Sequence, residues 1–322
     1  MKAIVLYQTG AAENLKQVDQ PLPVVNPGHV LIKVKAFGLN RSELMTRKGL
    51  SPDVLLPRVL GIECVGEVEH DPSGQLRKGQ QVAAFMGGMG REFDGSYATY
   101  AVLPLSIITP FESKLPWEIL GALPEMFQTA YGSLHAALKI QRGETLLIRG
   151  GTSSVGLLAA QLAKAYGLHV VSTTRSSDKE KFLLDHGANL VLIDDGNLAL
   201  KVKGKGLPEI DKVLELVGAG SLKDSLQCVK PGGAVCMTGM LSEQWSIPDF
   251  APMEFIPVTV NLTIYDSGQF RVEGEYFQTF VDDIEKGLIA PVVKRVFQFE
   301  EIVDAHVFME SNAGGGKIVV LV

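Results

Sequence analysis

The chain has 322 residues, of which 46% are hydrophobic and 20% are charged, and its formal net charge is −6. This composition is typical of a globular protein, and the length favours two domains. The acidic balance argues against nucleic acid or a polybasic membrane surface as a partner. The three cysteines, at positions 64, 228 and 236, show no CxxC spacing, which indicates a reducing compartment without disulfides.

Residues 1–7 have the pattern of a strand rather than that of a charged and then apolar leader. No apolar stretch is long enough to cross a bilayer. Together with the cysteine usage, these features lead us to expect a cytoplasmic protein without a membrane partner.

The N-terminal part of the chain, residues 1–121, is rich in strand and turn patterns. Residues 30–36 alternate between apolar side chains on one face and lysines on the other, as in a strand with one solvated side. Proline and glycine interrupt the segment repeatedly. We therefore predict an antiparallel, barrel-like domain here.

The pattern changes in residues 122–265. A short apolar strand at 145–148 leads into a glycine-rich turn and then a helix with apolar residues at i, i+3, i+4 and i+7. That apolar face comprises Val155, Leu158, Ala159, Leu162, Ala163 and Tyr166. Further strands are predicted at 170–174, 190–193, 212–216 and 234–238, and helices at 178–186 and 221–228. Strands alternating with helices predict a doubly wound parallel sheet of the Rossmann type.

The last segment, residues 266–322, is assigned to the same domain as residues 1–121. It is predicted to contain helices at 276–286 and 301–309 and strands at 292–297 and 317–322. The expected fold is therefore α/β, with a Rossmann domain inserted in an antiparallel β-barrel domain.

The glycine-rich turn is Gly150-Gly151-Thr152-Ser153-Ser154-Val155-Gly156. Glycines let the backbone turn tightly and approach a ligand, and the helix N-terminus offers N–H groups to a pyrophosphate. Ser154 holds a position where glycine is usual in such turns. The strand, turn, helix and second strand together predict a dinucleotide site, with an ordinary tight turn as the alternative.

The end of the second strand indicates which dinucleotide is bound. An NAD site usually carries an acid there, about 20 residues past the turn, to hold the ribose 2′-OH. Here Thr174, Arg175 and Ser176 follow one another, and Asp178 fits better as the start of the next helix. Arg175 can pair with a 2′-phosphate, and Ser176 and Lys179 can add donors, so we predict NADPH. The alternative is a solvated basic turn.

With these features, the chain resembles the medium-chain dehydrogenase/reductase superfamily, specifically its zinc-independent quinone oxidoreductase branch. The resemblance covers nearly the whole chain. The motifs in this order are specific to the family, although no single motif is. Its marks are Gly38-Leu-Asn40, Leu60-Gly-Ile-Glu-Cys-Val-Gly66, Phe93-Asp-Gly-Ser-Tyr-Ala-Thr-Tyr100, Gln128-Thr-Ala-Tyr-Gly132, the glycine turn and Gly316-Lys317. The resemblance implies that the barrel domain is GroES-like and catalytic.

Zinc alcohol dehydrogenases of this superfamily carry a cysteine near position 40 and a Gly-His-Glu sequence near position 61. This chain has Asn40 and Gly61-Ile62-Glu63 instead, so the cysteine and histidine ligands are both missing. The chain also lacks the close set of four cysteines that holds a structural zinc. A catalytic zinc normally has three protein ligands, so we predict no metal.

Without a metal to polarise an alcohol, the resemblance implies hydride transfer from NADPH to a quinone or an α,β-unsaturated carbonyl. It places Asn40 beside the nicotinamide, where its side chain can hydrogen-bond the acceptor carbonyl, and Thr129 in contact with the nicotinamide region. The alternative for Asn40 is a turn residue after a strand. We also expect Gly239 and Met240 to contact the cofactor.

Two other functions share this layout, an enoyl-thioester reductase and a non-catalytic NADPH-binding protein. Arg47 either shapes the mouth of the pocket or lies on a solvated helix face. The segment Val258–Ile264 is predicted as a strand at the end of the Rossmann sheet. Related enzymes pair that edge across a two-fold axis, which predicts a homodimer.

Overall fold

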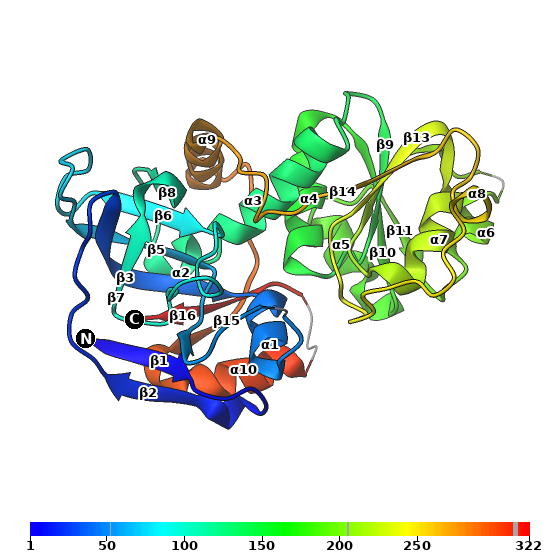
Figure 1. The fold of residues 1–322 in the computed structure, drawn as a ribbon. Coiled ribbons are helices and arrows are strands. Elements are labelled where there is room, and N and C mark those ends of the chain that lie inside the picture. Colours follow the sequence, from blue (N-terminus) through cyan, green and yellow to red (C-terminus); the bar gives the residue numbers. More distant parts are fainter. Residues whose placement is uncertain (52, 205, 312–314) are drawn as a thin grey trace. The chain divides into compact units, whose positions relative to one another are not determined.

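The computed structural model describes residues 1–51, 53–204, 206–311 and 315–322. The chain divides into two compact units: unit 1 comprises Met1–Glu125 and Val272–Val322, and unit 2 comprises Met126–Arg271 (Figure 1). Unit 2 is therefore inserted in the chain of unit 1. The sequence patterns predicted the two domain boundaries slightly earlier in the chain, after residues 121 and 265.

Unit 1 contains two sheets. The larger has the strand order β15-β16-β3-β5-β6-β8, with β7 also paired to β3, and the smaller has the order β2-β1-β4. The strands are β1 (Lys2–Leu6), β2 (Leu15–Asp19), β3 (His29–Leu39), β4 (Arg58–Val59), β5 (Glu63–His70), β6 (Gln81–Phe85), β7 (Tyr100–Pro104), β8 (Ile108–Pro110), β15 (Val293–Gln298) and β16 (Lys317–Leu321). Their pairings are antiparallel, except that β15 and β16 run parallel.

Short helices accompany these strands. They are α1 (Arg41–Lys48), α2 (Trp117–Leu120), α9 (Gly274–Glu285) and α10 (Ile302–Glu310), with 3-10 turns at Ala12–Asn14, Leu105–Ile107 and Phe299–Glu301. Helix α9 buries side chains at i, i+3, i+4 and i+7, which are Phe277, Phe280, Val281 and Ile284. This apolar stripe explains why the segment is a helix that packs on the sheet.

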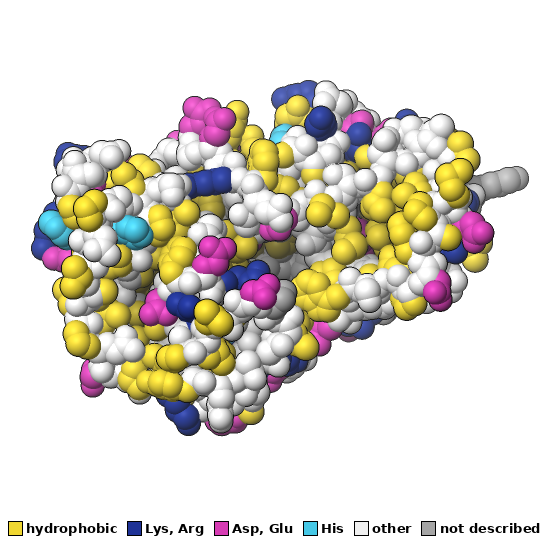
Figure 2. All heavy atoms as spheres, viewed as in Figure 1, with side chains coloured by type: hydrophobic (Ala, Val, Ile, Leu, Met, Phe, Trp, Pro, Cys, Tyr) yellow, Lys and Arg dark blue, Asp and Glu magenta, His cyan; other side chains and the backbone are white. Residues whose placement is uncertain are grey.

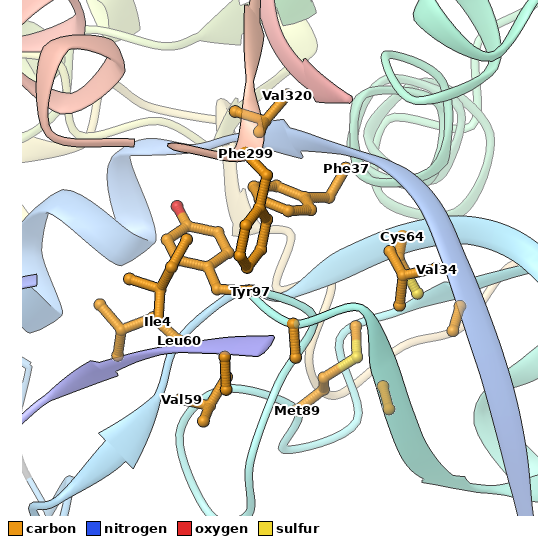
Figure 3. Close-up of a cluster of buried hydrophobic side chains, with 14 of the residues drawn as sticks. Ile4, Val34, Phe37, Val59, Leu60, Cys64, Met89, Tyr97, Phe299 and Val320 are labelled. Carbon is orange, nitrogen blue, oxygen red and sulfur yellow. The ribbon is translucent and has the colours of Figure 1, made fainter. Parts of the chain in front are cut away.

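The core of unit 1 is a cluster of buried side chains from both sheets and from α10. Strand β3 shows the predicted alternation, since Ile32 and Val34 are buried while Lys33 is exposed. Figure 3 shows part of the cluster, in which the rings of Phe37 and Tyr97 stack with their centroids 4.6 Å apart. Burial of these apolar groups is the main force that stabilises the unit, and it fixes the strand that leads to Asn40.

Unit 2 contains one parallel six-stranded sheet in the order β11-β10-β9-β12-β13-β14. The strands are β9 (Thr145–Arg149), β10 (His169–Thr174), β11 (Leu190–Ile193), β12 (Ile210–Glu215), β13 (Val229–Met237) and β14 (Asn261–Ile264). The helices are α3 (Pro124–Gly132), whose first residues belong to unit 1, α4 (Ser154–Tyr166), α5 (Glu180–Asp185), α6 (Leu198–Val202), α7 (Ala219–Cys228) and α8 (Pro252–Phe255), with a 3-10 turn at Ser177–Lys179 and a π turn at Ser133–Ala137. This strand order is that of a doubly wound Rossmann sheet, which confirms the predicted fold class. None of the described helices is long and apolar enough to span a bilayer.

Helix α4 buries a surface that is shifted from the predicted stripe, since Val155, Leu162 and Tyr166 are only half-buried. Leu158, Ala159 and Ala163 are buried as expected, and Leu157 and Ala160 are buried as well. The reason is that α4 lies against both β9 and β10, so two neighbouring stripes of the helix face the sheet.

The strand expected over Val258–Ile264 is shorter than predicted and begins only at Asn261. Val258 and Thr259 lie in a turn, and Thr259 has a φ of 65°, which ends extended structure at that point. The prediction of a strand for residues 258–260 was therefore wrong, because β-branched composition alone does not reveal a turn.

Candidate functional site

The glycine-rich turn joins β9 to α4 and is held by its own hydrogen bonds. Ser153 Oγ accepts from Gly156 N at 3.0 Å and donates to Gly150 O at 2.8 Å. Gly150 N donates to Thr173 Oγ1 at 3.1 Å, which ties the turn to the end of β10. The first N–H groups of α4 have no partner inside the helix, and with the helix dipole they offer a site for an anion.

Two glycines of the turn have no room for a side chain. A Cβ at Gly156 would lie 2.7 Å from Gly150 O and 2.9 Å from Gly151 Cα. A Cβ at Gly151 would collide with Ser172 Oγ. The turn therefore needs glycine for close packing of backbone on backbone, which is the role that these positions have in a dinucleotide-binding turn.

Basic side chains follow β10 beside this turn. Arg175 is exposed and Lys179 is half-buried, and neither forms an ion pair within the described ranges of the chain. Thr174 Oγ1 accepts from Ser176 N at 3.2 Å, which shapes the bend after the strand. A hydrogen bond from Ser176 holds the pKa of Asp178 below its usual value. Arg175 and Lys179 are therefore uncommitted donors, whereas the hydroxyl of Ser176 already serves Asp178.

The segment after β13 also approaches the glycine turn. A Cβ at Gly150 would lie 3.1 Å from Leu216 Cβ and 3.3 Å from Leu241 Cδ1, so the turn contacts residues that follow β12 and β13. A Cβ at Gly239 would collide with Leu216 O. Unit 2 thus brings the segment that contains Gly239 and Met240 next to the turn.

Thr129 in α3 is connected to the same region through Ser133. Ser133 Oγ donates to Thr129 O at 2.6 Å and shares a hydrogen bond with Thr238 Oγ1 at 2.9 Å. Ser133 is fully buried and begins a π turn, a feature that is common at functional sites. Sequence reasoning missed Ser133 and Thr238, because no motif marks them and they lie far apart in the chain. These two hydrogen bonds link the backbone of Thr129 through Ser133 to Thr238, the residue before Gly239.

These features of unit 2 fit an anionic dinucleotide. The tightly packed turn leads directly into a helix N-terminus, and two uncommitted cations lie at the end of the neighbouring strand.

Asn40 lies in unit 1, directly after β3, and is the N-cap of α1. Its backbone N donates to Glu43 Oε2 at 3.0 Å, and its Nδ2 donates to Glu63 Oε1 at 2.8 Å. Its Oδ1 accepts from Lys317 Nζ at 2.5 Å, and the same ammonium lies 2.6 Å from Glu63 Oε1. Asn40 is therefore a turn residue and also a member of a polar group, the Asn40 cluster, which consists of Asn40, Glu43, Glu63 and Lys317.

The charged members of the Asn40 cluster are buried. Glu63 is 0% exposed, Glu43 is 1% exposed and Lys317 is 3% exposed. Burial raises the pKa of Glu43 to about 7, and the charge of Glu63 adds to the rise, although backbone N–H groups oppose it. Glu43 can therefore hold or release a proton near neutral pH within this cluster.

Sequence reasoning identified only Asn40 as a functional residue of this cluster. Glu43 carried a signal, since a glutamate three residues after an asparagine cap is a capping-box pattern. Lys317 appeared only in the Gly316-Lys317 mark of the resemblance, and no local pattern linked it to Asn40, because all of unit 2 separates the two residues in the chain.

Arg47 is buried, so its interpretation as a residue on a solvated helix face was wrong. It is 1% exposed, donates to Gly10 O at 2.5 Å and pairs with Glu310. The ion pair and the carbonyl permit its burial. Burial and the charge of Arg47 lower the pKa of His306 to about 3, so this histidine is neutral beside Tyr97, whose hydroxyl lies 3.1 Å away.

Within residues 1–51, 53–204, 206–311 and 315–322, no group of three or more His, Cys, Asp or Glu side chains is arranged to hold a metal ion. At the Asn40 cluster the cation next to Glu63 is the ammonium of Lys317.

Two family models match the chain. The alcohol dehydrogenase GroES-like domain matches residues 26–113, and the zinc-binding dehydrogenase family matches residues 186–320. Quinone oxidoreductase of Mus musculus is 29% identical over 334 residues, and the match covers 100% of this chain and 98% of that protein. Quinone oxidoreductase of Homo sapiens is 28% identical over 329 residues with the same coverage.

Solved structures agree with this relationship. A mycobacterial protein complexed with NADPH superposes with a TM-score of 0.87 at 28% identity, with 100% of both chains covered. An NAD-dependent alcohol dehydrogenase gives a TM-score of 0.88 at 25% identity, again with 100% of both chains covered. With the Rossmann sheet and its glycine turn, these matches indicate an oxidoreductase that uses a nicotinamide cofactor. The chain belongs to the medium-chain dehydrogenase/reductase superfamily, in its quinone oxidoreductase-like branch.

Proposed function

We propose that this protein is an NADPH-dependent oxidoreductase that transfers hydride to a quinone or to an α,β-unsaturated carbonyl without zinc. The assignment of NADPH rests on Arg175. This residue is exposed, lies beside the glycine turn and has no ion pair in the described parts of the chain. A guanidinium pairs bidentately with phosphate, so it favours the 2′-phosphate of NADPH over the 2′-OH of NADH.

The proposal gives each part of the cofactor a set of contacts in unit 2. The turn Gly150–Gly156 takes the pyrophosphate, and the 2′-phosphate lies with Arg175 and Lys179, beside Thr174 and Ser176. Thr129, Gly239 and Met240 take the nicotinamide region, since Ser133, which follows α3, shares a hydrogen bond with Thr238 of the segment after β13. When bound, the cofactor supplies the hydride, while the chain binds and orients the reactants.

We assign Asn40 to the acceptor, whose oxygen receives a hydrogen bond from the amide as negative charge develops on it. Zinc is not required in this scheme, because Asn40 and Ile62 replace the cysteine and histidine of the zinc dehydrogenases. The ammonium of Lys317 also already compensates the charge of Glu63, which supports a site without a metal.

We also propose a homodimer formed through the edge of the sheet in unit 2. In the described part of the chain β14 pairs with β13 alone, so its other edge leaves backbone groups unpaired. Val258 and Ile264 near this edge are 86% and 66% exposed, and Figure 2 shows hydrophobic side chains gathered on the visible face of unit 2. A two-fold contact covers both edges at once, so light scattering is expected to give twice the chain mass and to show a monomer for Ile264→Lys. A wild-type monomer at working concentration would count against the dimer.

All three cysteines are buried and have free thiols. This supports the expectation of a reducing compartment such as the cytoplasm.

A panel of quinones, enones and acyl thioesters tests the reaction, with the oxidation of NADPH followed in each case. We expect turnover with quinones or enones and a lower kcat/KM with NADH. Turnover of acyl thioesters alone would identify an enoyl-thioester reductase instead. NADPH binding by calorimetry without turnover of any acceptor class would identify a non-catalytic binding protein.

A further inference from the structure

Lys317 is a buried cation that the proposed reaction does not use directly. It is the first residue of β16 and is 3% exposed. Its ammonium bonds Asn40 Oδ1 at 2.5 Å and Glu63 Oε1 at 2.6 Å. Lys317 begins β16 and Asn40 directly follows β3, and these two strands pair in the same sheet.

The donors and acceptors around Asn40 allow only one orientation of its amide. An ammonium is purely a donor and an ionised carboxylate is purely an acceptor. The oxygen of the amide must therefore face Lys317, while Nδ2 faces Glu63 Oε1 at 2.8 Å and Glu43 Oε1 at 3.4 Å. The reverse orientation would set the NH₂ group against the ammonium of Lys317 and the carbonyl against the carboxylate of Glu63.

The backbone of β3 makes room for this arrangement at Gly38. A Cβ at Gly38 would collide with Lys317 Cε and would lie 2.5 Å from Glu63 Oε1. Any side chain at this position would displace the ion pair. The space beside β3 is therefore shaped for Lys317 and Glu63, two residues before Asn40.

We propose that Lys317 is a positioning residue that, with Glu63, locks the Asn40 amide so that its N–H and not its carbonyl is offered to the acceptor oxygen. The inference rests on the proposed function. The N–H that makes the long 3.4 Å contact with Glu43 is the one that exchanges onto the acceptor, because it has the weaker bond to lose. The N–H at 2.8 Å from Glu63 and the bond from Lys317 stay in place.

A double-mutant cycle tests whether Lys317 acts on the reaction through Asn40 or independently of it. Asn40→Ala is expected to lower kcat by about tenfold to a thousandfold, the range for loss of one donor to a developing oxyanion. Lys317→Met is expected to lower kcat comparably at unchanged NADPH affinity, and the double variant to lose no more than the larger single loss. The inference is overturned if the fold-loss of kcat in the double variant equals the product of the two single losses. It is also overturned if Lys317→Met leaves kcat unchanged.

Two further variants guard against misfolding and non-specific effects. Lys317→Met leaves the carboxylate of Glu63 buried without its cation, so Lys317→Met/Glu63→Gln removes both charges together and is expected to show the same loss of kcat. Lys230→Met is the matched control, because it removes an ion pair with Asp211 in unit 2 and is expected to leave kcat unchanged. A loss in the control equal to that in Lys317→Met would contradict a specific role.

The amide orientation can be measured without turnover, so it remains testable if no acceptor is found. In protein labelled with ¹⁵N-asparagine, Asn40→Asp identifies the NH₂ signal of Asn40. We expect that signal to exchange slowly with solvent in the wild type, since both N–H groups face carboxylates, and to exchange faster in Lys317→Met. Fast exchange in the wild type, or no effect of Lys317→Met, would refute the orientation.

Discussion

The guanidinium of Arg149 makes two hydrogen bonds to the carboxylate of Asp194, from Nε at 2.7 Å and from Nη2 at 2.9 Å. Arg149 ends β9 directly before the glycine turn, and Asp194 follows β11. The same guanidinium bonds Asp224 at 2.8 Å and Ser225 at 3.0 Å, both in α7. The pair therefore ties two strand ends and a helix together beneath the proposed pyrophosphate site.

Arg149→Met is expected to lower the free energy of unfolding of the protein by about 3–5 kcal/mol. Arg149 is 2% exposed, and its loss leaves a largely buried carboxylate at Asp194 without a counter-charge. Chemical denaturation measures the change. Lys181→Met removes an exposed pair with Asp185 and should cost well under about 1 kcal/mol. Similar costs for the two variants would refute the structural role of Arg149.

Arg175→Ala is expected to weaken NADPH binding by about tenfold to a hundredfold and to leave NADH binding nearly unchanged. The reason is that one charge-assisted contact to the 2′-phosphate is lost, whereas NADH has no such group. Calorimetry with both cofactors measures the effect. The matched control is Lys164→Ala, which removes a cation from the exposed end of α4. Equal affinity of the wild type for NADPH and NADH would contradict the assignment.

Gly156→Val is expected to abolish measurable cofactor binding. A side chain there would press on Gly150 O, 2.7 Å from its Cβ, and would force the turn away from α4. Ala165→Val places the same valine side chain at an exposed position of α4 and should bind the cofactor normally. Cofactor affinity is measured by fluorescence titration after circular dichroism has shown that both variants are folded. Normal binding by Gly156→Val would remove the turn from the site.

Much of the fold was predictable because it depends on local patterns. The alternation in β3 and the glycine turn before α4 each follow from residues that are neighbours in sequence. The contacts that complete the sites are different, since Lys317 reaches Asn40 and Asp194 reaches Arg149 only when the sheets have formed. The hydrophobic periodicity of one segment does not indicate which distant residue will contact it in the folded protein.

Local patterns also failed where backbone conformation overrides composition. The β-branched run from Val258 to Ile264 predicted one continuous strand, but the positive φ of Thr259 delays the strand to Asn261. Arg47 was expected at or near solvent because of its charge, yet its pairing with Glu310 buries it. In both cases the deciding interaction comes from outside the pattern.

The stability of the protein is expected to depend on pH through Glu43. Its pKa rises from an ordinary value of 4.5 to about 7 in the folded state, so the folded state binds the proton more tightly. This contribution to stability is complete below pH 4.5 and is lost as the pH rises through 7, by on the order of 3 kcal/mol. Denaturation at several pH values should show this loss in the wild type relative to Glu43→Gln. A pH-independent difference between the two would contradict the raised pKa.

Activity is expected to survive exhaustive chelation, and elemental analysis should find no stoichiometric zinc. The physical reason is that Asn40 and Ile62 stand where the zinc dehydrogenases have a thiolate and an imidazole, and a catalytic zinc normally has three protein ligands. Activity is compared before and after dialysis against a chelator, with a zinc alcohol dehydrogenase treated in parallel as the control. One tightly bound zinc per chain, with loss of activity on its removal, would overturn this expectation.

Deuterium labelling tests whether hydride passes directly from NADPH to the acceptor. The wild-type protein is given an enone with NADPH that carries deuterium at C4 of the nicotinamide, on the side that is transferred. We expect a product with one deuterium at the β-carbon and a slower reaction than with unlabelled NADPH. A reduced product without deuterium at that carbon, or the absence of NADPH consumption with every quinone and enone, would contradict it.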